Sequence, residues 1–158
     1  MTKLMPALVA AGAFALLTMQ THAGFAAVLA APFLAVWFFY SLVIICRAPE
    51  RRRLQAARVL VWLVAVSAVA GVHWHKVRAS RLDAEQAATA ILAYKARHGA
   101  YPASLGEVGM DAAMLKKRWL LFYGMHEGNP TLFYAATFVP FETFHYDFEQ
   151  SQWRHNPD

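Results

Sequence analysis

The chain has 158 residues, of which 58% are hydrophobic and only 16% are charged, whereas charged residues make up about 25% of a typical soluble domain. Its net charge of +5 lies entirely before residue 59. Residues 47–58 carry five Arg and one Glu, and Lys3 supplies one more positive charge. Residues 76–158 carry nine basic and nine acidic side chains, which cancel. The composition argues against a freely soluble enzyme, and the charge distribution argues against nucleic-acid binding, because no basic face remains outside the apolar segments.

Three uncharged apolar runs occupy the first half of the chain, at residues 4–20, 25–46 and 59–75. A helix needs about 20 apolar residues to cross the hydrocarbon core of a bilayer. We therefore predict a membrane domain over residues 1–75 with three transmembrane helices. The first run has a second interpretation, since Lys3, the apolar stretch and the small residue at Ala23 are also typical of a cleavable secretion signal.

The connection over residues 47–58 contains a cluster of basic side chains: Arg47, Arg51, Arg52, Arg53 and Arg58. Basic residues in short loops stay on the cytoplasmic side, and the loop at residues 20–24 has none. This predicts a bacterial inner-membrane protein with a cytoplasmic N-terminus and a periplasmic segment 76–158, although Lys76, Arg78 and Arg81 also follow the third run. The cluster could bind anionic lipid headgroups or a cytoplasmic partner, but we favour a role as a topology determinant alone.

No strong helix breaker separates Leu54 from His98. The third run and the residues that follow it are therefore predicted to form one helix of about 45 residues. Its second half is amphipathic, with a face of three-four spacing that consists of Leu82, Ala84, Ala88, Ile91, Leu92 and Lys95. Gly99 and Pro102 would end the helix.

Aromatic and β-branched residues then predict strands at residues 119–125, 131–139 and 141–148, with a short fourth at 152–155. Alternation in the third strand places Phe144, Tyr146 and Phe148 on the core face. Such a sheet needs a helix against it to bury its apolar side. We therefore expect an α+β domain over residues 76–158, in which a small antiparallel sheet of three to four strands packs on the amphipathic half of the long helix.

The phrase AATAILAYKARHGAYPASLGEV at residues 87–108 resembles the end of the first helix in type IV pilins and type II secretion pseudopilins. The match is carried by Tyr94, Lys95, His98, Gly99, Tyr101, Pro102, Ser104 and Leu105. Residues 146–148 followed by Trp153 are similar to the closing hairpin of those domains. The resemblance implies a pilin-like fold for residues of about 80–155, in which Tyr94, Gly99, Tyr101, Pro102 and Leu105 join the helix to the sheet.

The chain departs from those proteins in two ways. Further apolar runs precede its long helix, and residues 49–63 lack both the Gly before the cleavage site and the Glu within the membrane helix. These departures argue against processing and against incorporation into a filament. They leave two alternatives for a membrane-held pilin-like module, an accessory or assembly protein for pili or secretion filaments and a domain reused for another purpose.

The sequence contains no arrangement typical of a catalytic or metal site. His73 and His75 lie about 200° apart around a helix and cannot share one ion there. Ser67, Ser104 and Ser151 stand in no nucleophile motif, and the glycines form no phosphate-binding loop. We predict no enzymatic activity, no metal, no cofactor and no small-molecule substrate.

The tail holds more aromatic residues than one face of a small sheet can bury. Exposed aromatic patches mark interfaces, and the candidate partner surface consists of Phe133, Phe138, Phe141, Phe144 and Trp153. The alternative, which we weigh equally, is that these rings fill the core and meet membrane lipids.

The expected function is a non-enzymatic inner-membrane accessory protein of type IV pilus or related secretion-filament assembly. Its periplasmic domain would bind a protein partner, such as a pilin or pseudopilin. The alternative is a membrane-anchored immunity or inhibitor protein against a toxin that acts in the periplasm.

Overall fold

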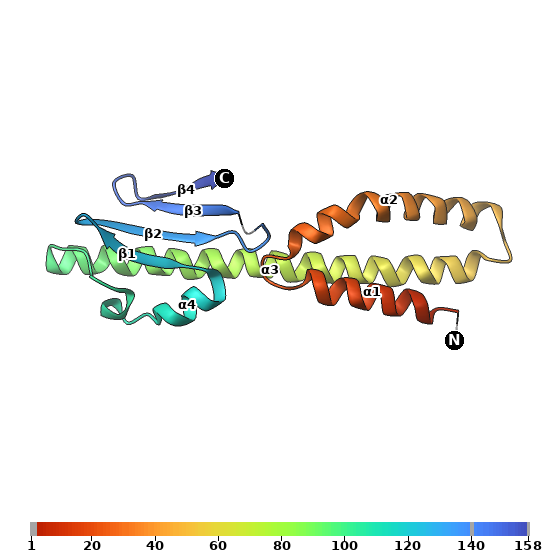
Figure 1. Ribbon diagram of the computed structural model, residues 1–158, viewed down its shortest axis with the longest axis horizontal. Coiled ribbons are helices and arrows are strands. Elements are labelled where there is room, and N and C mark those ends of the chain that lie inside the picture. The colour runs from red at the N-terminus through yellow and green to blue at the C-terminus, as the bar shows by residue number, and fades with distance from the viewer. Residues whose placement is uncertain (1–2, 140, 158) are drawn as a thin grey trace. The chain divides into compact units, whose positions relative to one another are not determined.

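The computed structural model describes residues 3–139 and 141–157. The chain divides into two compact units, and the boundary between them falls between Trp74 and His75. Helix α3 (Arg52–His98) runs without interruption through this boundary and contributes residues to both units (Figure 1).

The first unit contains helix α1 (Met5–Thr18), helix α2 (Gly24–Arg47) and the first part of α3. Two of these helices, α2 and α3, are long and apolar enough to cross a membrane. The prediction of a third span at residues 4–20 is wrong, because α1 has only 14 residues. At 1.5 Å per residue it is about 21 Å long, whereas the hydrocarbon core is about 30 Å thick.

Helix α1 ends early because a polar turn follows it. His22 has a φ of 68°, in the left-handed region that breaks a helix. The Nε2–H of buried His73 donates a hydrogen bond of 2.7 Å to the carbonyl oxygen of Thr18, the last residue of α1. At its other end, Arg58 Nη2 donates to the carbonyl oxygen of Lys3 at 3.1 Å. Helix α1 therefore lies beside the part of α3 between Arg58 and His73.

Helices α2 and α3 are joined by a buried polar contact and by aromatic rings. The Nε2 amide of Gln55 donates to Ser41 Oγ at 2.7 Å, and both side chains are buried. The ring centroid of Trp62 lies 6.1 Å from that of Trp37 on α2 and 5.5 Å from that of Phe14 on α1. Trp62 thus packs against both other helices of this unit.

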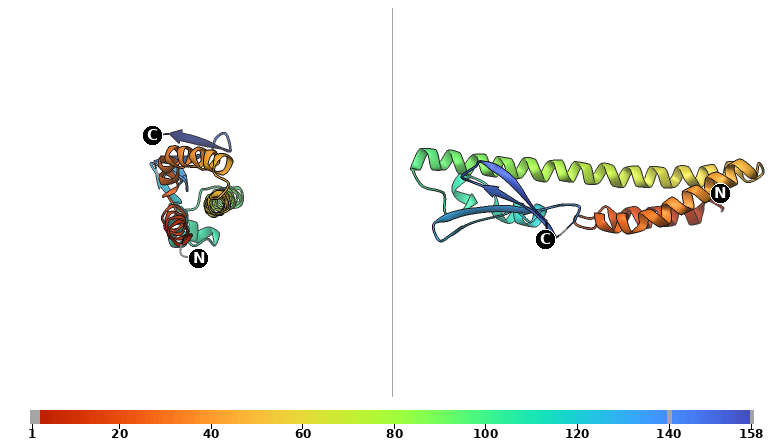
Figure 2. Two further views of the ribbon diagram at one scale, coloured as in Figure 1. Left: turned by 90° about the vertical axis from the view of Figure 1, so that its right-hand side faces the viewer. Right: turned by 90° about the horizontal axis from the view of Figure 1, so that it is seen from above.

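The second unit is an α+β layer structure. Its antiparallel sheet has the order β1-β2-β3-β4 and packs on the second half of α3 (Figures 1 and 2). The strands are β1 (Phe122–His126), β2 (Asn129–Ala135), β3 (Glu142–Asp147) and β4 (Gln152–Pro157). The four-stranded antiparallel arrangement confirms the predicted fold class at this level.

The core of this unit contains four α3 side chains, Ala84, Ala87, Ala88 and Ile91, none of them more than 3% exposed. The three alanines allow the sheet to approach the helix closely. Leu82, predicted to share this face, is instead 51% exposed. The core face includes Ala87 instead. At about 100° per residue, Leu82 lies about 200° from Ala84 around the helix, on the opposite side, whereas Ala87 lies only about 60° from Ala84.

A short helix separates α3 from the sheet and shifts the predicted first strand. After the 3-10 helix η1 (Leu105–Val108) comes helix α4 (Ala112–Trp119). The carboxylate of Asp111 accepts from the Met114 N–H at 2.9 Å, which is the usual N-cap bond. Leu120, with a φ of 52°, ends α4. Strand β1 therefore begins at Phe122 instead of Trp119, because Trp119 belongs to this helix.

The register of the sheet is set by the turn between β1 and β2. Both turn residues, Glu127 and Gly128, have positive φ, the conformation of a two-residue type I′ hairpin turn. Phe133 on β2 consequently lies opposite Phe122 on β1 and opposite His145 on β3. These three side chains share the outer face of the sheet.

The inner face of the sheet is formed by the residues that alternate along each strand with those of the outer face. Tyr134 lies opposite Phe144, and Tyr146 lies opposite Trp153. Phe144, Tyr146 and Phe148 pack against the hydrophobic core, which confirms the predicted core face of this strand.

Candidate functional site

The arginine cluster gathers where α2 turns into α3. Arg47 is the last residue of α2, Arg51 precedes α3, and Arg52, Arg53 and Arg58 lie within α3. The Nε of Arg52 donates to the carbonyl oxygen of Ile45 at 2.8 Å. A cation at a helix C-terminus is favourable because the last carbonyls have no partner within the helix. Arg52 therefore has a structural role in ending α2, beyond any effect of its charge on topology.

The pilin-like phrase forms the joint between α3 and the sheet. Gly99 has a φ of 74°, and its N–H donates to the carbonyl oxygen of Lys95 at 2.8 Å. The Tyr94 ring stacks on His98 in the last turn, with centroids 4.1 Å apart. The Nζ of Lys95 lies 4.2 Å from the centre of the Tyr101 ring. The end of α3 is thus held by contacts within its own last turn and just beyond it.

The loop after α3 is fastened to the sheet by buried contacts. Pro102 and Leu105 are almost fully buried, and the Tyr101 ring packs edge to face on Phe148 at 5.3 Å. Burial raises the pKa of Tyr123 to about 12. Its hydroxyl, which is protonated at neutral pH, donates to the carbonyl oxygen of Pro102 at 2.7 Å. This segment has a structural function.

The five aromatic residues of the predicted partner surface do not form one surface. Phe144 and Trp153 face inward and pack against the core. Phe133 lies on the outer face of the sheet. Phe138 and Phe141 lie in the connection between β2 and β3, where Phe141 is 68% exposed. The structure therefore separates a core pair, an outer-face residue and a loop pair.

The outer face carries a stack of rings across three strands, which we call the outer-face stack and define as Phe122, Phe133 and His145. The Phe122 and Phe133 centroids lie 5.1 Å apart with an interplanar angle of 17°, and those of Phe133 and His145 lie 5.1 Å apart at 18°. Lys116 Nζ lies 4.9 Å from the centre of the Phe122 ring. Half-buried rings in this arrangement offer a flat apolar surface with a cation at one end.

A groove runs beside the outer-face stack. Its volume is about 470 Å³, and it is lined by residues of β1 and β2 that include Phe122, Gly124, Thr131 and Phe133. A Cβ placed on Gly124 would meet no atom within 4 Å. The groove is open because Gly124 has no side chain.

Three members of this site, Phe122, Gly124 and His145, were not predicted from the sequence. The signal that could have found Phe122 is the two-residue turn at Glu127 and Gly128. Once this turn is fixed, counting back along the strand places Phe122 opposite Phe133.

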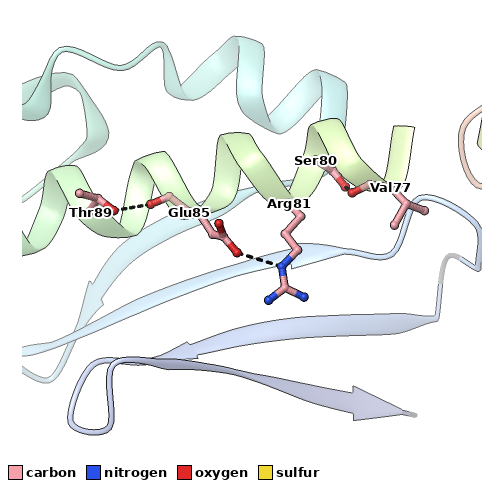
Figure 3. A network of polar contacts seen from close by, with 5 residues as sticks. All are labelled: Val77, Ser80, Arg81, Glu85 and Thr89. Atoms are coloured by element: carbon pink, nitrogen blue, oxygen red, sulfur yellow. Dashed lines mark hydrogen bonds and ion pairs between the residues drawn. The ribbon is translucent and has the colours of Figure 1, made fainter. Parts of the chain in front are cut away.

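A second cleft lies between α3 and the β3–β4 hairpin. Its volume is about 490 Å³, and its lining includes Arg81, Glu85, Tyr146 and Trp153. Arg81 Nε donates to Glu85 Oε1 at 2.9 Å, while Thr89 Oγ donates to the backbone carbonyl oxygen of Glu85 at 2.8 Å (Figure 3). Both charged side chains are about half exposed, so this ion pair contributes little to stability.

Within residues 3–139 and 141–157, no three His, Cys, Asp or Glu side chains converge in a way that could hold a metal ion. The outer-face stack and its groove offer apolar area, a lysine and a histidine. This arrangement is suited to binding, in which flat rings are covered by a partner.

No protein-family model matches the chain, and no curated protein or solved structure matches it either. The resemblance of residues 87–108 to pilins and pseudopilins remains a prediction.

Proposed function

We propose that this chain is a non-enzymatic accessory protein of the bacterial inner membrane, which serves the assembly of a type IV pilus or related secretion filament. Its α+β unit binds a protein partner in the periplasm, such as a pilin or pseudopilin. The observation that carries the proposal is the single helix α3, whose first part is an apolar membrane-span candidate and whose second part forms the core of a domain with an exposed aromatic face.

Membrane anchoring is supported by the side chains of α2 and of the first part of α3. Large apolar residues on these helices are exposed, among them Phe33 at 78%, Phe39 at 72% and Leu60 at 61%. Such exposure is costly in water and favourable in lipid. We infer that the arginine cluster, which lies between the two candidate spans, stays in the cytoplasm and that the residues after His75 lie in the periplasm, because basic residues in short loops remain on the cytoplasmic side.

The pilus assignment is supported by the phrase at residues 87–108 and by its position. The phrase ends a long helix whose alanine-rich face packs on an antiparallel sheet, which is what the resemblance implies. The partner site is the outer-face stack with its groove, because aromatic rings supply large contact area at low entropic cost.

The proposal is tested in the bacterium that carries the gene. Deletion should abolish surface filaments, and the wild-type gene should restore them. Gly124→Leu adds an apolar side chain to the groove at a position where a Cβ would meet no atom within 4 Å. It should fail to restore filaments, while the protein accumulates normally by immunoblot.

The matched control is Gly106→Leu, which adds the same side chain at an exposed glycine outside the groove and should restore filaments. Normal filaments in the deletion strain would refute the accessory role. Sensitivity of that strain to a periplasm-acting toxin, with filaments intact, would favour the immunity function instead.

A further inference from the structure

The connection between β2 and β3 is apolar and presents an aromatic side chain outward. Residues 136–141 read Ala-Thr-Phe-Val-Pro-Phe. Phe141 is 68% exposed, and Phe138 and Val139 are half-buried. The Ala136 N–H donates to the carbonyl oxygen of Glu142 at 2.8 Å, which closes the base of the connection. We call residues 136–139 and Phe141 the aromatic loop.

The aromatic loop lies beside the first turns that α3 contributes to the second unit. Thr137 and Phe138 line the same small pocket of about 210 Å³ as Val77 and Ser80. The turn between β1 and β2 lies at the other end of the sheet, near the end of α3 (Figure 1). The loop therefore marks the end of the second unit at which α3 enters.

This end lies at the level of the lipid headgroups if α3 crosses the membrane. The uncharged run of α3 ends at His75, and Val77 is about 3 Å further along the helix axis. The headgroup layer extends about 5–7 Å beyond the hydrocarbon core on each side. Phe138, beside Val77, therefore lies within this layer.

The charges around this level fit a lipid surface. Lys76, Arg78 and Arg81 follow the uncharged run within two turns, and Arg78 and Arg81 are exposed. Aromatic rings together with Lys and Arg are typical of segments at a membrane interface. Two carboxylates also lie near this level, and each has a basic side chain beside it. Glu142 Oε2 lies 3.2 Å from His155 Nε2, and Glu85 is paired with Arg81.

We propose that the aromatic loop inserts into the periplasmic surface of the membrane that α3 crosses, with Phe141 at the boundary between headgroups and acyl chains. Lys76 and Arg78 contact lipid phosphates at the same level. The α+β unit is then held to the bilayer at two points, α3 and the loop. This inference rests on the membrane anchoring in the proposed function.

The test measures the depth of three labelled positions in the full-length protein. Cys46→Ala removes the single cysteine, and Phe141→Cys, Met125→Cys and Leu63→Cys are each labelled with an environment-sensitive fluorophore. The proteins are reconstituted in vesicles of phosphatidylethanolamine and phosphatidylglycerol, with or without lipids that carry a nitroxide quencher near the headgroup. Met125 is the matched control, because it is an exposed apolar residue at 40% on β1, near the opposite end of the sheet.

We expect the fluorescence of the labels at positions 141 and 63 to be quenched by the nitroxide and their emission to be blue-shifted. The label at position 125 should behave like a water-exposed probe. Quenching at 63 with a label at 141 that behaves like that at 125 would overturn the aromatic-loop proposal and leave the anchoring intact. Equal quenching at 141 and 125 would also overturn it, because the contact would not be specific to the loop. A label at 63 that is not quenched would refute the anchoring itself, and the loop insertion with it.

Discussion

Truncation of Ile91 should strongly destabilise the α+β unit. Ile91 is fully buried between α3 and the sheet, and Ile91→Ala removes three carbon atoms from its side chain. At about 0.8 kcal/mol per buried carbon the transfer loss is about 2.4 kcal/mol. The cavity left behind adds to this, so we expect a total loss of about 3–4 kcal/mol.

The assay is resistance to protease as a function of urea, measured on the full-length protein in detergent and read from the fragment that contains the C-terminus. With a slope of about 1.5 kcal/mol per molar urea, the midpoint should fall by about 2 M. Leu82→Ala, on the same helix but at a side chain that is 51% exposed, is the control and should shift it far less. Equal shifts for the two variants would refute the assignment of the core face.

Three further predictions concern polar side chains. Thr137→Val removes a buried hydroxyl that has no partner among the described residues, so stability should stay constant or rise by about 1 kcal/mol; a comparable loss in the same urea assay would indicate that the hydroxyl binds water or a ligand. Backbone N–H groups of the β3–β4 turn lower the pKa of Asp147, so its carboxylate adds stability above its ordinary pKa of about 3.9 that disappears as the pH falls through the lower folded value. Asp147→Asn should make the urea midpoint depend less on pH below about pH 4. The same dependence on pH in the variant and in the wild type would contradict this. Ser41→Ala removes the acceptor of the Gln55 amide and should cost about 0.6–2 kcal/mol in detergent thermal melts; exposed Ser67→Ala should cost nothing measurable, and equal losses would argue against the α2–α3 contact.

Local pattern was sufficient to predict the long helix and the joint that follows it. The prediction of one helix from Leu54 to His98 agrees with α3, because helix continuation depends on the absence of breakers over neighbouring residues. Gly99 could be recognised as the end because a left-handed residue there favours glycine. The α+β class followed from the change from helical to alternating periodicity.

The boundaries of the short helices α1 and α4 depend on single contacts, which cannot be recognised from the amino-acid composition of the segments. Helix α4 has eight residues, too few for a periodic signal, and it is fixed by the bond from the Met114 N–H to Asp111. Helix α1 stops at Thr18, where a polar turn follows, although the apolar run alone predicted a span.

The amino-acid sequence by itself determined the apolar helices, the arginine cluster between them and the elements of the domain, because these depend on side chains close together along the chain. The tertiary structure decided which aromatic residues share a surface. Phe133 and Phe144 were grouped in one candidate surface, yet the register places them on opposite faces of the sheet. A strand has a period of two, so a shift of one residue exchanges the faces, and only the turn at Glu127 and Gly128 together with burial against α3 selects one register.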